Sequence, residues 1–397
     1  MLRFLTAGES HGRGLMALVE SFPAGYDVSA DDINRQLERR QKGYGRGGRM
    51  QIERDRVTIL SGVRGGKSLG SPIACLIDNI DWPNWQHLMA PDSLRPDKWT
   101  ADERRRGKTS APRPGHADLA GAVKYFTHDL RNVLERASAR ETAARVICGS
   151  IARQLLSVYN IRVTSHVVAI GKARAGRRKV SFDDIETAAD RSPVRCVDPV
   201  VSKRMMNEID EAMQDGDTIG GVFEVRAVNV PIGLGSYAQW STRLDGLLAG
   251  ALMSIQSVKG VEIGDGFAAG RRRGSQVHDR IGFDPHEIPG HRKGFIRRTN
   301  AAGGIEGGLS NGGEIVIRAA CKPLATLRRP LETVDLVTKK RTTAITERSD
   351  ACVVPAAAVV GEAMMAMVLA SAFTDKFGHD SRTDIDAGFA AFLEREL

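Results

Sequence analysis

Residues 353–373 constrain the fold more than any other part of the sequence, because they form a long stretch rich in Ala, Val and Met. A stretch of this length is either a membrane span or a helix buried inside a protein. It contains Pro355 and Glu362, and a charged side chain is costly inside a bilayer. Pro355 suits the first turn of a helix, where its missing N–H leaves no hydrogen bond unmade. We therefore predict a buried core helix in a soluble protein.

The composition agrees with a large globular core. Of the 397 residues, 42% are hydrophobic and 26% are charged, which excludes disordered, collagen-like and small disulfide-stapled proteins. The five cysteines are scattered and form no C-x-x-C pair, so we expect buried thiols in a reducing compartment. The first residues contain no long apolar stretch typical of a secretory signal. We therefore expect a cytoplasmic protein with one large domain or two smaller ones.

Helix and strand signals mix along the chain without strict βαβ alternation. Ser29 is a typical N-cap, with Asp31 and Asp32 in the first helical turn, and the helix should stop at Gly43. Further helices are expected at 139–159 and 244–259, and strands at 161–170, 222–230 and 315–319. The basic, irregular stretch 271–298 is expected to be an exposed loop. This mixture favours an α+β or layered architecture over a doubly wound parallel sheet.

The charge balance indicates an anionic partner. Lys and Arg total 57 against 48 Asp and Glu, a formal net charge of +9. Nucleic acid, an acidic membrane face and phosphorylated small molecules all fit a positive excess. Aromatic residues make up only 5% of the chain, which is few for a protein that stacks on bases. With no recognisable nucleic-acid module, a phosphorylated small molecule is the favoured partner, and we expect neither nucleic acid nor a membrane.

Several short motifs fail on their context or spacing. Residues 43–48 match G-x-G-x-x-G, but a predicted helix precedes them and a strand follows, the reverse of a dinucleotide-binding fingerprint. Residues 62–68 imitate a phosphate-binding P-loop with one residue too few between the outer glycines. His278, His286 and His291 match no recognised metal motif. We therefore expect no metal site.

Two histidines are framed by residues that shape the backbone around them. His11 lies in Gly8-Glu9-Ser10-His11-Gly12, and His116 in Arg113-Pro114-Gly115-His116-Ala117-Asp118. A turn histidine without chemistry is the alternative for each, considered alone. Glycine lets a ligand approach closely, and Asp118 could orient or tune the second ring. Together the two motifs indicate acid–base chemistry on an anionic substrate.

The arginines gather around glycines. Arg39, Arg40, Lys42, Arg46 and Arg49 lie in one glycine-punctuated stretch with little opposing acid nearby in the sequence. Others precede His116 or flank Ser138. A solvated basic surface is the alternative interpretation, but guanidinium groups set by glycines suit bidentate capture of phosphate and carboxylate.

Taken together, these motifs resemble those of chorismate synthases. Three long segments carry the resemblance: residues 8–12 continuing to 22–25, residues 135–143 and residues 348–355. Shorter family motifs match at 43–50, 113–118, 260–267, 303–308 and 322–326. The likeness covers most of the chain and is weakest at 171–207 and 271–298. Two departures stand out, since Ser21 and His379 occupy positions where glycine is usual.

The resemblance implies a fold and a reaction. The fold would be a layered β–α–β sandwich, a single domain over residues 1–397, assembled as a homotetramer. The reaction would be the 1,4-elimination that converts 5-enolpyruvylshikimate 3-phosphate to chorismate and phosphate in the shikimate pathway of aromatic amino acid biosynthesis. It needs reduced FMN although it involves no net redox change. Some members are assigned NADP at positions matching Arg40 and Arg46.

The resemblance also implies which residues form the site. His11, His116 and Asp350 match the catalytic positions: a proton donor to the leaving phosphate, a histidine that supports the reduced flavin, and a carboxylate that assists at flavin N5. The implied substrate-binding residues are Ser10, Arg40, Arg46, Arg49, Arg113, Arg140 and Arg348. The implied flavin-binding residues are Arg136, Ala137, Ser138, Gln256, Ser257, Gly307, Lys322, Pro323, Leu324, Ala325, Thr326 and Arg348.

Overall fold

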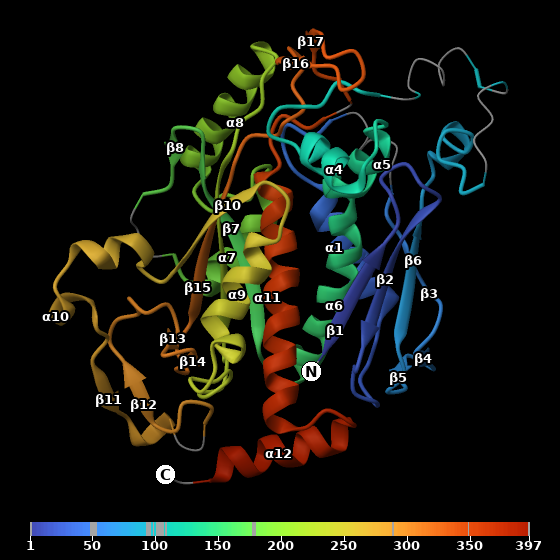
Figure 1. The fold of residues 1–397 in the computed structure, drawn as a ribbon. Coiled ribbons are helices and arrows are strands. Elements are labelled where there is room, and N and C mark those ends of the chain that lie inside the picture. The colour runs from blue at the N-terminus through green and yellow to red at the C-terminus, as the bar shows by residue number, and fades with distance from the viewer. Residues whose placement is uncertain are drawn as a thin grey trace.

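The computed structural model shows a single domain of mixed helices and strands (Figure 1). It describes residues 2–47, 54–92, 97, 99–100, 107, 109–176, 180–287, 290–347 and 349–395.

One antiparallel sheet is built from the N-terminal part of the chain. Its strand order is β1-β2-β6-β3. The strands are β1 (Arg3–Ala7), β2 (Gly14–Glu20), β6 (Ile73–Asp78) and β3 (Val57–Ile59). Along β2 and β6 buried residues alternate with more exposed ones, so one face of the sheet packs on the core. The loop after β1 carries His11.

A second antiparallel sheet is built from the middle of the chain. Its strand order is β10-β15-β9-β7-β8. The strands are β10 (Val258–Ile263), β15 (Ile315–Cys321), β9 (Gly221–Val228), β7 (Arg162–Ile170) and β8 (Ala173–Arg174). The three strands predicted from sequence all lie in this sheet, as β7, β9 and β15, with boundaries shifted by one or two residues.

Four helices lie between the two sheets or beside them, and α11 and α6 run through the centre of Figure 1. They are α1 (Ala30–Gln41), α6 (Thr142–Val158), α9 (Leu244–Met253) and α11 (Val354–Phe377). By length and composition α11 could cross a membrane, but 89% of its most apolar window is buried inside the protein. The predicted buried helix is therefore confirmed, with Pro355 in its first turn.

The remaining helices and hairpins surround this core. The helices are α4 (Asp118–Tyr125), α5 (Arg131–Ala137), α7 (Phe182–Ala188), α8 (Pro199–Gln214), α10 (Gly274–Val277) and α12 (Arg382–Glu394). The two-stranded hairpins pair β4 (Val63–Arg64) with β5 (Lys67–Ser68), β11 (Ile281–Phe283) with β12 (Phe295–Arg297), β13 (Ile305–Glu306) with β14 (Leu309–Ser310), and β16 (Glu332–Val334) with β17 (Arg341–Thr343).

Several predicted elements need correction. The Ser29 cap is confirmed, since its hydroxyl accepts the N–H of Asp32, and the helix ends at Gln41. The helix predicted over 244–259 is wrong in its second half, because α9 ends at Met253 and β10 begins at Val258. Residues 271–298, predicted as an exposed loop, contain α10 and the β11–β12 hairpin. These elements are too short to leave a clear periodicity in the sequence.

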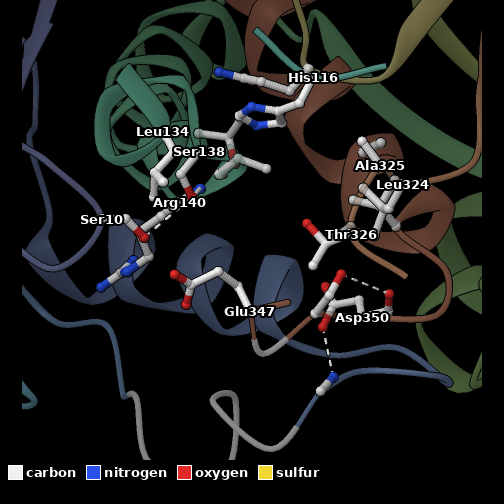
Figure 2. Close-up of a pocket in the computed structure, with 18 of the residues that line it drawn as sticks. Ser10, His116, Leu134, Ser138, Arg140, Leu324, Ala325, Thr326, Glu347 and Asp350 are labelled. Carbon is white, nitrogen blue, oxygen red and sulfur yellow. Dashed lines mark hydrogen bonds between the residues drawn. The ribbon is translucent and has the colours of Figure 1, made fainter. Parts of the chain in front are cut away.

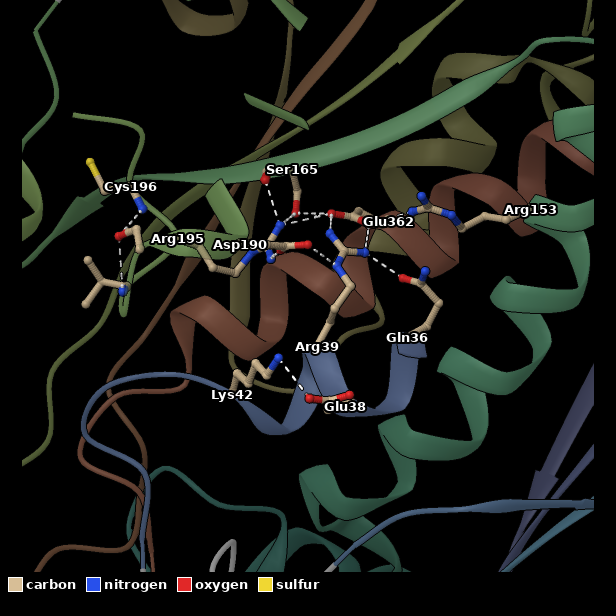
Figure 3. A network of polar contacts seen from close by, with 12 residues as sticks. Gln36, Glu38, Arg39, Lys42, Arg153, Ser165, Asp190, Arg195, Cys196 and Glu362 are labelled. Carbon is tan, nitrogen blue, oxygen red and sulfur yellow. Dashed lines mark hydrogen bonds and ion pairs between the residues drawn. The ribbon is translucent and has the colours of Figure 1, made fainter. Parts of the chain in front are cut away.

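A buried ion cluster joins the central helices to the second sheet (Figure 3). Glu362 on α11 receives two hydrogen bonds from Arg39 of α1, at 2.6 and 2.9 Å. Arg153 of α6 and Arg195 donate to the same carboxylate at 2.5 and 3.1 Å, and the Ser165 hydroxyl of β7 donates at 2.7 Å. Burial alone raises the pKa of Glu362, but the three arginines outweigh burial and lower that pKa to about 2.

We predict that Glu362→Gln lowers the free energy of unfolding at neutral pH by about 3–5 kcal/mol, because it leaves three guanidinium groups without their shared carboxylate. Denaturant titration of the purified protein measures this change. The matched control is Glu38→Gln, whose exposed carboxylate pairs with Lys42 at 2.9 Å. An exposed pair of this kind contributes little, so the control should remain close to wild type.

The pH dependence gives a second measure of the same cluster. The pKa of Glu362 is about 2 in the folded protein and ~4.3 in the unfolded chain. The ionised carboxylate therefore makes its full contribution to the free energy of unfolding above the unfolded-state pKa. That contribution is lost as the pH falls toward the folded-state pKa. The stability gap between wild type and Glu362→Gln should therefore narrow below about pH 4. A gap that stays constant down to the acid transition would show that the charge is not the stabilising feature.

Candidate active site

A cavity of about 370 Å³ opens where the two central helices begin. Its volume is typical of a small-molecule site. Figure 2 shows side chains from both ends of the sequence facing this common space, among them Ser10, His116, Glu347 and Asp350. Residues in the first turns of α11, together with Leu134 and Ile255, supply an apolar part of the wall. The cavity therefore combines a few convergent polar groups with an apolar surface.

His11 is held by a charged partner and a ring. Its Nδ1 lies 3.0 Å from both carboxylate oxygens of Glu135, at the end of α5. The backbone N–H of His11 donates to the same carboxylate at 2.8 Å. The indole of Trp85 stacks on the imidazole, with centroids 3.8 Å apart. His11 is thus fixed in orientation at the cavity wall.

His116 has a similar arrangement on another element. Its Nδ1 lies 2.6 Å from Asp118 Oδ1, at the start of α4. Arg113 donates to the same carboxylate from its Nε at 2.8 Å and to the Thr326 hydroxyl at 2.8 Å. Burial alone raises the pKa of Asp118, but hydrogen bonds and charge from His116 and Arg113 lower that pKa well below its ordinary value. The carboxylate is therefore ionised and accepts the Nδ1–H of His116.

Two arginines of the cavity wall share one buried carboxylate. Arg140 lies 2.7 Å from Asp55, and Arg40 lies 3.5 Å from it. Arg40 also donates from its Nε to the Thr142 hydroxyl at 2.9 Å. Asp55 is almost fully buried, so its carboxylate fixes the positions of both guanidinium groups. Fixed guanidinium groups bind oxyanions with little loss of side-chain entropy.

Arg46 and Asp350 form a further pair across the cavity rim. Arg46 Nη1 lies 2.8 Å from Asp350 Oδ2. The backbone N–H of Gly47 donates to Asp350 Oδ1 at 2.6 Å, a bond drawn in Figure 2. The loop after α1 is thereby joined to the loop before α11.

One part of the wall suits a flat amide-bearing ligand. The Gln256 side chain lines the cavity and donates to Glu141 at 3.1 Å. Its Oε1 is buried, and no described residue donates to it. Leu324, Ala325 and Thr326 face the same space from the loop after β15 (Figure 2). An unpartnered buried acceptor beside apolar side chains indicates that a ligand with an N–H group belongs there.

Comparison with known proteins identifies the family and supports the fold. A family model for chorismate synthase matches residues 2–374. The chain belongs to the chorismate synthase family. Chorismate synthases from Symbiobacterium thermophilum and Desulforudis audaxviator are 53% and 55% identical over 395 residues, covering 99% and 100% of this chain and 99% and 98% of theirs. A chorismate synthase crystal structure matches with a TM-score of 0.77 at 42% identity, covering 99% of this chain and 97% of that one.

Family membership makes the chain an enzyme, a lyase, and the implied site residues fall into three groups. Those that line the cavity are Ser10, His11, Arg40, Arg46, Arg113, His116, Ser138, Arg140, Gln256, Leu324, Ala325, Thr326 and Asp350. Those described but placed outside this wall are Arg136, Ala137, Ser257, Gly307, Lys322 and Pro323. Arg49 and Arg348 lie outside the described residues, so the structure assigns them no position.

Two of the residues outside the wall support loops that form it. Arg136 donates to the backbone oxygens of Thr6 and Gly8 at 2.8 and 3.1 Å, just before Ser10 and His11. Lys322 Nζ donates to the Gly115 oxygen at 2.9 Å, beside His116. Both side chains connect to the loops that carry the two histidines.

The sequence analysis missed the pairing of the arginines with carboxylates, although it named Asp350 as a site residue. The arginine stretch has little opposing acid nearby in the sequence, but in the structure Asp55 faces Arg40, and Asp350 faces Arg46. Glu347 also lines the cavity and accepts from Arg131 at 3.0 Å. No local pattern could reveal these pairs, because most of the partners are distant in the sequence. The described wall is therefore charged in both signs rather than uniformly positive.

We predict that Gly47→Ala lowers turnover by about tenfold to hundredfold. A Cβ at Gly47 would lie 2.8 Å from the Ser349 oxygen and 3.4 Å from Asp350 Oδ1, so the loop that carries Asp350 must move, and small displacements of site groups are costly. Steady-state kinetics measures the effect. Gly250→Ala in α9 is the control, since nothing lies within 4 Å of its Cβ position. Equal kinetics in both variants would contradict the prediction.

Proposed function

We propose that this chain converts 5-enolpyruvylshikimate 3-phosphate to chorismate and phosphate by 1,4-elimination, with reduced FMN and without net redox change. The observation that carries the proposal is the meeting of His11, His116, Asp350 and four guanidinium groups at one cavity. The guanidinium groups belong to Arg40, Arg46, Arg113 and Arg140. These elements come from five separate parts of the sequence, and all of them match family positions.

The substrate's charges match the wall. In the elimination, the bond between ring carbon 3 and the phosphate oxygen breaks, and a proton leaves carbon 6. The substrate carries a phosphate and two carboxylates, which bidentate guanidinium groups bind well. Phosphate departs more easily when its developing charge is neutralised. The arginines fixed by Asp55 and Asp118 supply that charge, and His11 supplies a proton to the leaving group.

The residues present fit a flavin beside the substrate. Gln256 Oε1 is a buried acceptor without a described donor, Ser138 adds a hydroxyl, and Leu324 and Ala325 provide an apolar surface. When bound, reduced FMN lends electron density to the allylic system of the substrate. His116, held by Asp118, is the histidine that supports the reduced flavin, and Asp350 is the carboxylate that helps to take up the ring proton. Because Asp350 already contacts Arg46 and Gly47, its position is fixed before ligands bind.

The wider family expectations are part of the same proposal. We expect a cytoplasmic homotetramer, and NADP remains a family expectation at Arg40 and Arg46. Both arginines are paired with carboxylates in the described residues. An anaerobic assay with the shikimate ester tests the activity and the reductant together, with reduced FMN, oxidised FMN, or oxidised FMN plus NADPH. Product with reduced FMN supports the proposal, and product in the last arm shows that the protein reduces its own flavin.

We predict that His11→Ala and His116→Ala each lower kcat by about 10²–10⁴-fold, the usual contribution of general acid–base groups. The assay uses saturating reduced FMN under anaerobic conditions. His379→Ala is the control, since that side chain is exposed and does not line the cavity. Full activity in either cavity variant would refute the role given to that histidine.

We predict that Gln256→Leu weakens binding of FMN about tenfold, because the variant removes the buried acceptor that a flavin N–H would meet. Titration of protein with FMN, followed by flavin fluorescence, measures the dissociation constant. Gln239→Leu, at an exposed position beyond the cavity wall, should bind FMN as wild type does. Unchanged affinity in Gln256→Leu would place the flavin elsewhere.

A further inference from the structure

The Glu135 carboxylate contacts the cavity residue His11 and also Arg131. Only 1% of its side chain is exposed. It accepts the His11 backbone N–H at 2.8 Å, contacts His11 Nδ1 with both oxygens at 3.0 Å, and accepts Arg131 Nη1 at 2.8 Å. Burial alone raises the pKa of Glu135, but its contacts with His11 and Arg131 lower that pKa below the ordinary value. The carboxylate is therefore ionised.

An ionised carboxylate determines which ring nitrogen carries a proton. It can only accept hydrogen bonds, so the nitrogen facing it must be an N–H. His11 therefore carries a proton on Nδ1 whenever the observed contact is made. Any proton that His11 delivers to a ligand has to come from Nε2, and that requires the doubly protonated, positively charged ring.

Trp85 favours the same charged state from the face of the ring. Its indole stacks on the His11 imidazole with centroids 3.8 Å apart and an interplanar angle of 22°. A cation over an indole face is stabilised by the ring quadrupole. Asp81 fixes the indole, because Trp85 Nε1 donates to its carboxylate at 3.0 Å. The imidazole is thus held along its edge by Glu135 and across its face by Trp85.

We propose that Glu135 is the positioning residue for His11: its buried carboxylate fixes the Nδ1–H form of the ring and stabilises the imidazolium from which Nε2 delivers a proton. The proposal rests on the acid role given to His11 above. It extends that role to a residue in α5, and Trp85 supports it as a stacking partner.

Other charged groups near His11 determine how strongly Glu135 stabilises the imidazolium. Arg131 contacts Glu135 and lies 5.2 Å from the centre of the Trp85 ring, so it opposes the imidazolium. Glu347 pairs with Arg131 at 3.0 Å and partly cancels that opposition. Asp81 adds a further negative charge behind Trp85. Glu135 is the only one of these groups for which the structure gives a direct contact with the imidazole.

The protein contains a matched pair for comparison. His166 on β7 and Glu224 on β9 lie 3.1 Å apart, and both side chains are at least as well buried as His11. Neither residue lines the cavity. Glu224 contacts two arginines as well, at 2.6 and 2.7 Å. Replacing it removes a buried carboxylate from a histidine without touching the proposed chemistry.

The kinetic test uses E135Q, E135D and the control E224Q. In E135Q the amide keeps the shape and one acceptor but loses the charge. We expect kcat to fall about tenfold to hundredfold, less than for His11→Ala. We also expect the alkaline limb of the kcat/KM profile to move to lower pH by about one unit. E135D should recover the position of that limb, and E224Q should leave it unchanged. A limb that stays in place in E135Q would overturn the proposal.

A second readout needs neither substrate nor flavin. In the ligand-free protein, ¹⁵N NMR of the His11 ring reports the proton on each nitrogen as pH is raised. We expect the ring to lose its second proton at lower pH in E135Q than in wild type, and W85L to show a smaller change in the same direction. Identical titration curves would refute the positioning role. If E135Q does not fold, E135A, which also removes the carboxylate, takes its place in both measurements.

The two proposals can fail separately. If His11→Ala remains active, His11 is not the acid, whatever the NMR shows for its ring. If His11→Ala is inactive while E135Q keeps the wild-type pH profile and ring titration, the acid role stands and the role of Glu135 is refuted.

Discussion

The close approach of α6 and α11 is the constraint on which the rest of the structure depends. A Cβ at Gly149 would lie 2.3 Å from the Ala363 Cα, so only glycine allows the two backbones to meet there. On another side of α11, a Cβ at Gly361 would lie 2.7 Å from the Phe223 ring of β9. The helix pair and the second sheet are therefore packed without freedom to slide. Because the first turns of both helices line the cavity, this packing also determines where the cavity lies.

Within that rigid frame, the cations are held by carboxylates that come from elsewhere in the chain. Asp55 fixes Arg40 and Arg140 together, and Asp350 fixes Arg46. Each pair partly neutralises a charge that an anionic ligand would use, which lowers the attraction at long range. However, the guanidinium groups are already ordered before a ligand binds, so little side-chain entropy is lost on binding. A wall that carries both charges has guanidinium groups that bind an anion and carboxylates that can accept a proton.

The sequence predicted those features that depend on neighbouring residues. The Ser29 cap and the buried α11 are local, since each follows from a few adjacent side chains or from one apolar run. The end of α9 was missed because Ser257 takes a left-handed φ of 74° before β10, which an otherwise apolar pattern does not reveal. Ser21, where the resemblance leads us to expect glycine, adopts φ of 59°, so the backbone still has a conformation that glycine favours. The pairing of Asp55 with Arg40 and of Asp350 with Arg46 was missed because it forms only in the folded chain.

The two histidines differ in whether their carboxylate partners can be predicted from the sequence. His116 finds its carboxylate two residues downstream, and Asp118 could be suspected from the sequence alone. His11 finds Glu135 only after 124 residues, when α5 packs against the loop that follows β1. The Ser10 N–H donates to the backbone oxygen of Glu135 at 3.0 Å, so the backbone itself holds the loop to the helix. One carboxylate–imidazole pair is thus encoded locally and the other by tertiary packing. The second depends on the position of a helix, so a change in the packing of α5 would alter the chemistry of His11 without touching either side chain.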